Sequence, residues 1–257
     1  MGKGVSRMNK RTGIRAGVMA PILPDELIVR EDALQWLLTC AGQEQQAEEC
    51  LLKGITAGGE NFYRCSMKSV EISGCSFHNC DFEKASFVDV LFRGCDFSGS
   101  RLTDCYFHRC AFLSVKGVGA DFHESLFKEV RMENCVFSYA NFSGTSWDSA
   151  ALSGCDLQES YLEECRLKRT ALAQVKLNRA NLFETSLRGL DLRSCEIESI
   201  LVSDEKKELA GAVVDEFAVY MARAIYNIVL MYDPQQIILQ GLLAYGGEYL
   251  EKKLNDL

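Results

Sequence analysis

Three histidines, twelve cysteines and several adjacent acidic residues are the groups in this chain that could carry out chemistry. An imidazole beside a thiol or hydroxyl could act as a base for a nucleophile, and grouped thiols could ligate zinc. The spacing argues against both. The cysteines form no Cys-x-x-Cys pair, and all of them are separated by multiples of five residues. The chain also lacks a glycine-rich phosphate-binding motif.

These residues belong to a five-residue repeat. From Phe62 to Ile197, every fifth residue is large and apolar, with Gly117 as the single exception. In an extended chain, each such repeat centre points to the same side as the residue two positions before it. That second position holds mostly Cys, Ala, Val, Ser and Thr, whereas the other three positions are mostly polar. Each unit is therefore interpreted as a short extended segment and a turn, with two buried side chains, and the units must stack to be stable.

In this arrangement the thiols point inward and the imidazoles outward. The three histidines directly follow repeat centres and lie on three different sides: His78, His108 and His123. Ten cysteines occupy the small inward position, which indicates reduced, buried thiols and a cytoplasmic protein: Cys65, Cys75, Cys80, Cys95, Cys105, Cys110, Cys135, Cys155, Cys165 and Cys195. Adjacent acids such as Glu163 and Glu164 lie on open surface. The sequence predicts no catalytic residue, no metal site and no cofactor.

The repeat units resemble those of the pentapeptide repeat family. The resemblance is carried by stretches such as Cys80-Asp81-Phe82-Glu83-Lys84, Cys95-Asp96-Phe97-Ser98-Gly99 and Ala180-Asn181-Leu182-Phe183-Glu184. It covers residues 50–203 and implies an all-β fold, a right-handed quadrilateral β-helix with four five-residue units in each coil. Gly117 leaves a gap in the column of centres, and we expect a local flattening or bulge there.

The segments outside the repeats are predicted to cap the solenoid. Residues 1–24 are predicted to be a disordered basic tail. Residues 25–49 are predicted to form an N-terminal helical cap, opened by Pro24 and Asp25, in which Trp36 serves packing. Residues 204–257 are predicted to form a C-terminal cap with a dimerisation helix and a tail. No apolar run is long enough to span a membrane.

The C-terminal segment carries two further resemblances. An apolar helix is predicted from Asp215 to Tyr232, and residues 200–215 are similar to the C-terminal cap of quinolone-resistance members of the family. That resemblance implies a homodimer formed through this helix, with contacts from Phe217, Met221, Ile225 and Ile228. Residues 224–241 are similar to part of the ROK family of sugar kinases and repressors. The nucleotide, sugar and zinc motifs of that family have no counterpart, so no ROK site residue and no small-molecule substrate is predicted.

The charges differ between the sides of the predicted solenoid. The side centred on Phe62, Phe82, Leu102, Phe122, Phe142, Leu162 and Leu182 is named the acidic side, because it carries nine acids against three basic residues. These acids are Glu60, Asp81, Glu83, Asp104, Asp121, Glu124, Glu163, Glu164 and Glu184. The next side, named the basic side, carries Lys68, Arg109, Lys128, Arg166, Lys168, Arg169 and Arg188 against three acids. The third side is neutral, and the fourth is weakly acidic.

A regular rod with one acidic side is predicted to bind a partner. The resemblance to quinolone-resistance proteins implies DNA mimicry, binding to bacterial DNA gyrase or topoisomerase IV, and protection from quinolones. A negative rod can occupy a positive nucleic-acid groove through electrostatics. The net charge of −8 argues against direct nucleic-acid binding. The alternative is an interaction scaffold or immunity factor without a topoisomerase target, for which the neutral side or the tail would be the contact.

Overall fold

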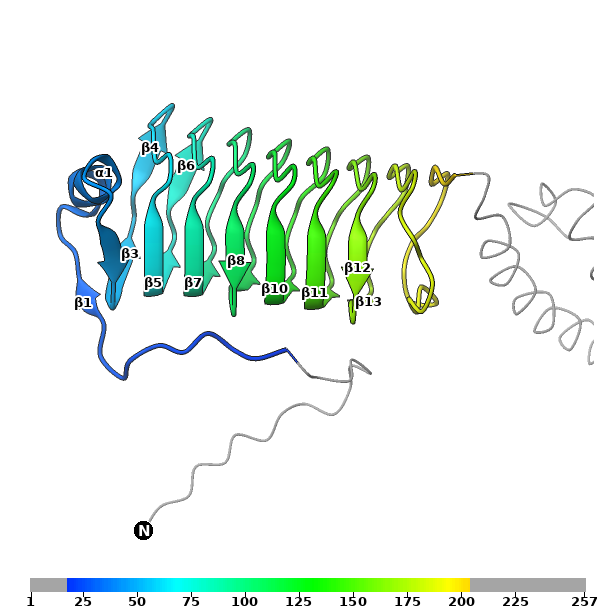
Figure 1. Ribbon diagram of the computed structural model, residues 1–257, viewed down its shortest axis with the longest axis horizontal. Coiled ribbons are helices and arrows are strands. Elements are labelled where there is room, and N and C mark those ends of the chain that lie inside the picture. Colours follow the sequence, from blue (N-terminus) through cyan, green and yellow to red (C-terminus); the bar gives the residue numbers. More distant parts are fainter. Residues whose placement is uncertain (1–17, 204–257) are drawn as a thin grey trace, which may run out of the picture. The chain divides into compact units, whose positions relative to one another are not determined.

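The computed structural model describes residues 18–203, which form a mostly-β solenoid of about seven turns with one short helix (Figure 1). The helix, α1, spans Ala33–Gly42. The strands are β1 (Ile28–Val29), β2 (Gln46–Glu48), β3 (Cys50–Lys53), β4 (Thr56–Gly58), β5 (Ser66–Ser73), β6 (Ser76–His78), β7 (Ser86–Arg93), β8 (Tyr106–His108), β9 (Ala111–Leu113), β10 (Leu126–Glu133), β11 (Ser146–Ser153), β12 (Arg166–Lys168) and β13 (Ala171–Ala173).

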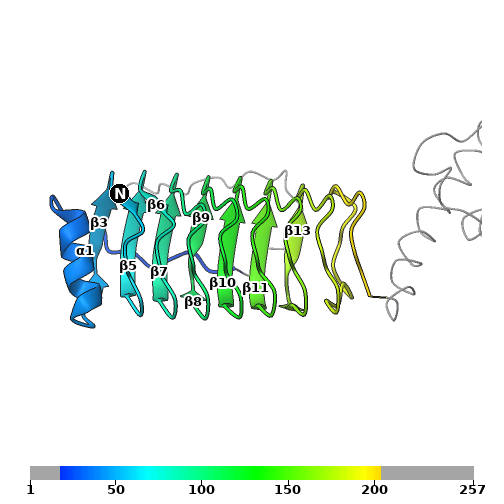
Figure 2. The same ribbon diagram turned by 90° about the horizontal axis from the view of Figure 1, so that it is seen from above.

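Neighbouring turns pair in parallel with an offset of twenty residues. Ser66 of β5 lies opposite Ser86 of β7, and β10 pairs with β11 at the same offset. Single bridges, such as the one between Asp81 and Arg101, continue this pairing where regular strands are absent. Because the register does not change, residues twenty apart form columns along the solenoid (Figure 2). The prediction of a β-solenoid built from stacked five-residue units is confirmed.

One residue in each unit turns the chain. Every fifth residue from Glu49 to Gly189 has a positive φ, and most of these residues are not glycine. For an L-residue this conformation costs about 1–2 kcal/mol. Hydrogen bonds to the next turn offset that cost, because the same residues donate their backbone N–H groups across the sheet. The N–H of Lys84, for example, donates to the carbonyl oxygen of Thr103 at 2.9 Å.

The repeat centres fill the interior with columns of stacked rings. Phe87, Phe107 and Phe127 follow one another with centroid separations of 4.9 Å, and the next ring, Trp147, lies 4.3 Å from Phe127. The 4.9 Å separations match the spacing of paired strands, about 4.7–4.9 Å, and the Phe127–Trp147 separation is slightly shorter. The backbone pairing and the ring stacking therefore demand the same rise for each turn.

The small inward position also forms hydrogen bonds. The Cys105 thiol donates to the carbonyl oxygen of Phe82 at 3.1 Å, and the Ser125 hydroxyl donates to that of Leu102 at 2.7 Å. Eleven of the twelve cysteines are fully buried, and all twelve are free thiols. The predicted burial is confirmed for nine of the ten cysteines, since Cys195 is only half-buried. The hydrogen bonds from this position to the preceding turn explain why Ser and Thr also occupy it.

Gly117 does not mark a bulge, contrary to the prediction. Its backbone N–H donates to Val136 at 2.8 Å, and the bridge between Lys116 and Val136 keeps the common register. A Cβ atom at Gly117 would lie 2.8 Å from Cδ1 and Cε1 of Phe137. The ring of the next turn therefore fills the space of the missing side chain, and glycine is required for close packing.

The C-terminal half of the core is packed less tightly. Leucine replaces phenylalanine at the repeat centres from Leu152 onward. An apolar cavity lies in this half, lined among others by Trp147, Leu157 and Leu177. Leu187 and Leu192, near the end of the described residues, are only partly buried. Unlike the flat rings, branched leucine side chains do not stack face to face at the rise of one turn.

The N-terminal cap contains more than a helix. Ile28 and Val29 form β1, which pairs with β3, and α1 begins only at Ala33, after Asp32. Pairing at the twenty-residue offset begins at β2, where Ala47 takes the place of a repeat centre and is fully buried. Trp36 serves packing as predicted, with the Arg30 guanidinium 4.3 Å from its ring centroid.

Two predicted segments lie outside the described residues. The C-terminal cap, including Phe217, Met221, Ile225 and Ile228, falls in residues 204–257, and most of the basic tail falls in residues 1–17. Residues 18–24, which were also assigned to the tail, are described, and Ile22 contacts the solenoid.

Replacing Gly117 by alanine should destabilise the solenoid. The new methyl group would overlap the Phe137 ring, and such overpacking costs about 1–3 kcal/mol. Urea denaturation of the full chain measures the change in the free energy of unfolding. Gly58→Ala is the matched control, because no atom lies within 4 Å of a Cβ there. Equal effects at the two sites would contradict the packing role of Gly117.

Replacing Gly59 by valine should test the cost of the left-handed turn. Gly59 has a φ of +72°, whereas its neighbour Gly58 in β4 does not have a positive φ, and a Cβ would meet no atom within 4 Å at either residue. Gly59→Val should lower the free energy of unfolding by about 1–2 kcal/mol. Gly58→Val should leave it unchanged or raise it, since valine favours strands. Thermal denaturation of both variants provides the comparison, and equal losses would disprove the backbone explanation.

Candidate interaction surface

The constant twenty-residue offset places the predicted acids on one side. Asp81 pairs with Arg101, Arg101 with Asp121, and Asp121 with Asn141. The remaining predicted acids follow in the adjoining positions of the same turns: Glu60, Glu83, Asp104, Glu124, Glu163, Glu164 and Glu184. Glu164 and Glu184 are exposed, as are Asp104 and Glu124. The geometry thus brings these nine residues onto a common side, although it does not leave all of them available.

The N-terminal part of the acidic side is neutralised within the chain. Arg101 forms ion pairs with Asp81 and with Glu83, the latter at 2.9 Å. Lys84 lies 3.1 Å from Glu83. Although partial burial raises the pKa of Asp81, the hydrogen bonds from Arg101 and from the Glu83 N–H outweigh burial and hold it below its usual value. These carboxylates are already partnered and present little net charge to a ligand.

The C-terminal part keeps its negative charge. Among residues 18–203, no lysine or arginine forms an ion pair with the acids in this list: Asp104, Asp121, Glu124, Glu163, Glu164 and Glu184. Asp121 instead accepts a hydrogen bond from the Asn141 amide at 2.9 Å. His123 lies 3.7 Å from Glu124 and adds charge only when it is protonated.

Exposed aromatic rings lie among these acids. Tyr161 and Phe183 occupy successive turns of the acidic side and are 51% and 50% exposed. Tyr161 stands two residues before Glu163, and Phe183 directly precedes Glu184. Aromatic rings at this exposure are frequent anchors in protein interfaces, and their faces attract cations. The group Tyr161, Glu163, Glu164, Phe183 and Glu184 is named the aromatic–acidic patch.

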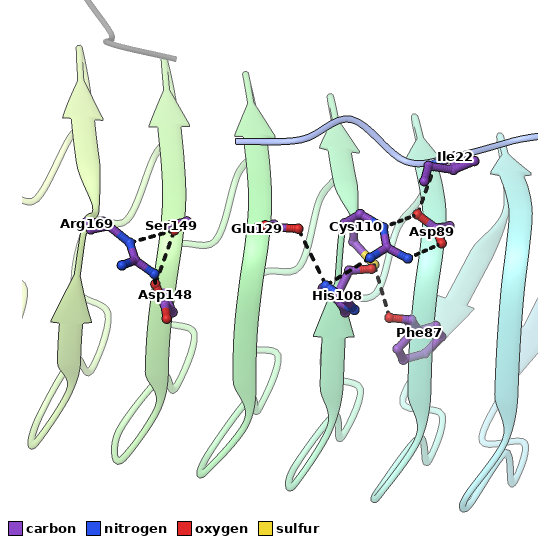
Figure 3. A network of polar contacts seen from close by, with 10 residues as sticks. Ile22, Phe87, Asp89, His108, Cys110, Glu129, Asp148, Ser149 and Arg169 are labelled. Carbon is purple, nitrogen blue, oxygen red and sulfur yellow. Dashed lines mark hydrogen bonds and ion pairs between the residues drawn. The ribbon is translucent and has the colours of Figure 1, made fainter. Parts of the chain in front are cut away.

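The basic side is partly neutralised by its own acids. Arg109 binds Asp89 through two hydrogen bonds of 2.7 Å, and Arg169 forms an ion pair with Asp148 (Figure 3). Asp89 is only 3% exposed. Burial raises the pKa of Asp89, but the hydrogen bonds from Arg109 and from the N–H of Ile22 outweigh burial and hold the pKa below its usual value. The carboxyl therefore stays ionised at neutral pH.

The histidines and thiols are separated as the sequence predicted. His78, His108 and His123 each lie beside a carboxylate on a different side, at 3.9, 3.5 and 3.7 Å from Asp96, Glu129 and Glu124. The thiols point into the core, and burial raises the pKa of Cys110 to about 12. In residues 18–203 no three His, Cys, Asp or Glu side chains converge as metal ligands.

Sequence reasoning missed the pairing within each side. It counted charges for a whole side, whereas several of the ion pairs join residues twenty positions apart, as Asp81–Arg101 and Asp89–Arg109 do. Opposite charges at this spacing were the available signal. The contact between Ile22 and Asp89 spans 67 residues and had no comparable signal.

None of the helices in the described residues is long and apolar enough to cross a membrane.

Comparisons with known proteins match both parts of the chain. The model of the pentapeptide repeat region matches residues 85–162, and that of pentapeptide repeats (nine copies) matches residues 61–101. The ROK family model matches residues 158–257, which begins within the last turns of the solenoid. No curated protein sequence matches the chain.

Several solved structures match part of the chain. QnrB1, described as a plasmid-mediated fluoroquinolone resistance protein, is 20% identical in a trypsin-treated form, with a TM-score of 0.42, covering 62% of this chain and 94% of that one. HetL, a pentapeptide repeat protein involved in heterocyst differentiation regulation from the cyanobacterium Nostoc sp. strain PCC 7120, is 14% identical, with a TM-score of 0.26 and coverages of 62% and 85%. A pentapeptide repeat protein from the thylakoid lumen of Arabidopsis thaliana is 17% identical, with a TM-score of 0.24 and coverages of 56% and 70%.

The five-residue period, the twenty-residue turn and the two family matches agree with one another, and residues 61–162 are a pentapeptide repeat domain.

Proposed function

We propose that this protein binds a positively charged groove of a partner protein through the C-terminal part of its acidic side. The observation that carries this proposal is the contrast along that side. Arg101 and Lys84 neutralise the carboxylates of the first turns, whereas the later turns present acids without such partners, together with exposed rings. A partner rich in lysine and arginine complements this surface by charge.

The target that we propose is bacterial DNA gyrase or topoisomerase IV, bound by mimicry of DNA in the cytoplasm. The choice of target rests on the sequence resemblance to quinolone-resistance members of the pentapeptide repeat family. Regular carboxylates on a stiff rod support it, since they can replace phosphates in an electropositive groove. Pairing continues in register from Gln46 to Leu201, without an inserted loop. The proposed contact is therefore the side of the rod itself, and quinolone protection would follow from occupation of the groove.

Reversing charges on the acidic side tests the contact. The full chain is titrated to about 50 µM into gyrase and topoisomerase IV supercoiling and relaxation assays, with and without ciprofloxacin. Glu124→Lys, Glu163→Lys and Glu164→Lys in one chain should weaken any effect at least about tenfold, through repulsion from a basic groove. The matched control reverses Glu133, Glu159 and Glu198, which lie on other sides. No effect of the wild-type chain would exclude the topoisomerases and leave the alternative, a scaffold or immunity factor.

Removing the exposed rings tests the aromatic–acidic patch. Tyr161→Ala with Phe183→Ala should reduce partner affinity about tenfold or more, as loss of interface anchors does. The melting temperature should change little, because both rings are half exposed. Isothermal titration with the partner measures the loss, and Leu126→Ala, a 39% exposed residue on the basic side, is the control. Equal affinity of the double variant and the wild type would remove the patch from the interface.

A further inference from the structure

A segment before β1 lies against the outside of the solenoid. Residues 18–27, named the strap, are described with the solenoid, and the N–H of Ile22 donates to Oδ1 of Asp89 at 3.0 Å. Figure 3 shows Ile22 above Asp89, outside the strands. Ile22 is 58% exposed, and Met19 is 51% exposed. Five other apolar residues of the strap are half-buried, namely Val18, Pro21, Leu23, Pro24 and Leu27. The strap therefore buries some apolar surface in addition to forming its hydrogen bond with Asp89.

Asp89 is oriented by a chain of polar contacts. Nε and Nη2 of Arg109 donate to the two oxygens of the Asp89 carboxylate, each at 2.7 Å. Nη1 of the same guanidinium lies 3.2 Å from Nε2 of His108. A guanidinium has only donors. The contact is a hydrogen bond when Nε2 accepts it, which is the neutral imidazole with its proton on Nδ1. A proton on Nε2 would instead face Glu129, whose Oε2 lies 3.5 Å from the same nitrogen.

The groups around His108 favour its neutral form. Its ring faces Arg109 and Lys128, the negative charges of Asp89 and Glu129, and the ring of Tyr106 at 5.9 Å. Loss of solvent lowers the pKa of His108 first, and the cations Arg109 and Lys128 lower it further, while Glu129, with Oε2 at 3.5 Å, and Asp89 oppose them only in part. The closed network thus disfavours protonation of His108.

We propose that the strap is a pH-dependent latch, closed while neutral His108 accepts from Arg109 and released when His108 is protonated. Protonation removes the acceptor at Nε2 and leaves two cations, the imidazolium and the Arg109 guanidinium, 3.2 Å apart. The protonated Nε2 then donates toward Glu129, whose Oε2 already lies 3.5 Å away, and Arg109 loses the acceptor that holds it beside Asp89. Because the closed state disfavours the proton, its stability is lost as the pH falls through the ordinary range of histidine, about 6.5. Asp89 stays ionised throughout this pH interval. Of the linked groups Asp89, Arg109 and His108, His108 is therefore the one that titrates.

Release of the strap changes the surface that the solenoid presents. Asp89, at 3% exposure, and Arg109 lie at the corner between the basic and neutral sides. The open state uncovers this pair and frees the backbone of residues 18–27. The latch is independent of the proposed partner, because it lies away from the acidic side.

Hydrogen exchange of the full chain tests the latch. The protection factor of the Ile22 amide, which donates to Asp89, should fall about tenfold between about pH 8 and about pH 5.5 after correction for the intrinsic rate, because one charge-assisted hydrogen bond is lost. His108→Gln should remain closed at both values, since glutamine accepts at any pH. Asp89→Asn should be open at both. His123→Gln, a histidine on the acidic side, should behave as the wild type.

The outcomes separate a latch from a general loss of structure. Amides of β10 should keep their protection in every variant, which shows that the solenoid stays folded. Strap protection that is the same at both pH values in the wild type would overturn the proposal. An equal fall in His108→Gln would also overturn it, because the titrating group would then be another one.

Discussion

The structure depends on one constraint, which is that residues twenty apart are paired through their backbones in every turn. Each unit donates several N–H groups to neighbouring turns, and these bonds hold the left-handed residue at every corner. The same offset sets the separation of stacked rings, such as Phe107 and Phe127 at 4.9 Å. A change of register would misalign rings, inward thiols and surface columns at once, which explains why the pairing continues unbroken past Gly117.

The sequence predicted the elements that repeat. Its period of five identified the repeat centres and the small inward position, and these residues are buried in the structure except in the last turns, where several are only partly buried. Ala47 was missed as a centre because it is small, and β1 was missed because Ile28 and Val29 also suit a helical pattern of apolar spacing. The left-handed corners were hidden as well. Their residues range from Gly to Glu, Lys and Arg, and the conformation is imposed by pairing with the next turn rather than by local preference.

For the surface, the sequence predicted which residues share a column but not which of their charges are left unpaired. Placing nine acids on one side needed nothing but the offset, but their availability depends on which neighbours twenty residues away carry the opposite charge. Arg101 stacks on Asp81 and cancels it, whereas Asp121 stacks on Asn141, which donates a hydrogen bond and leaves the charge. A side with the same total charge can therefore be inert at one end and available at the other.

The strap shows how a regular rod acquires a site that is not repeated. Every turn offers a corner residue, yet only Asp89 among the corner acids is nearly buried, because an external segment covers it and an arginine one turn later satisfies both of its oxygens. A buried carboxylate must be fully hydrogen-bonded to remain ionised. The contact between Arg109 and His108 is not needed to keep Asp89 ionised, but it adds a group that titrates near neutral pH. The stability of the corner thus depends on the protonation of His108, whereas the stability of the solenoid beneath it depends on backbone pairing.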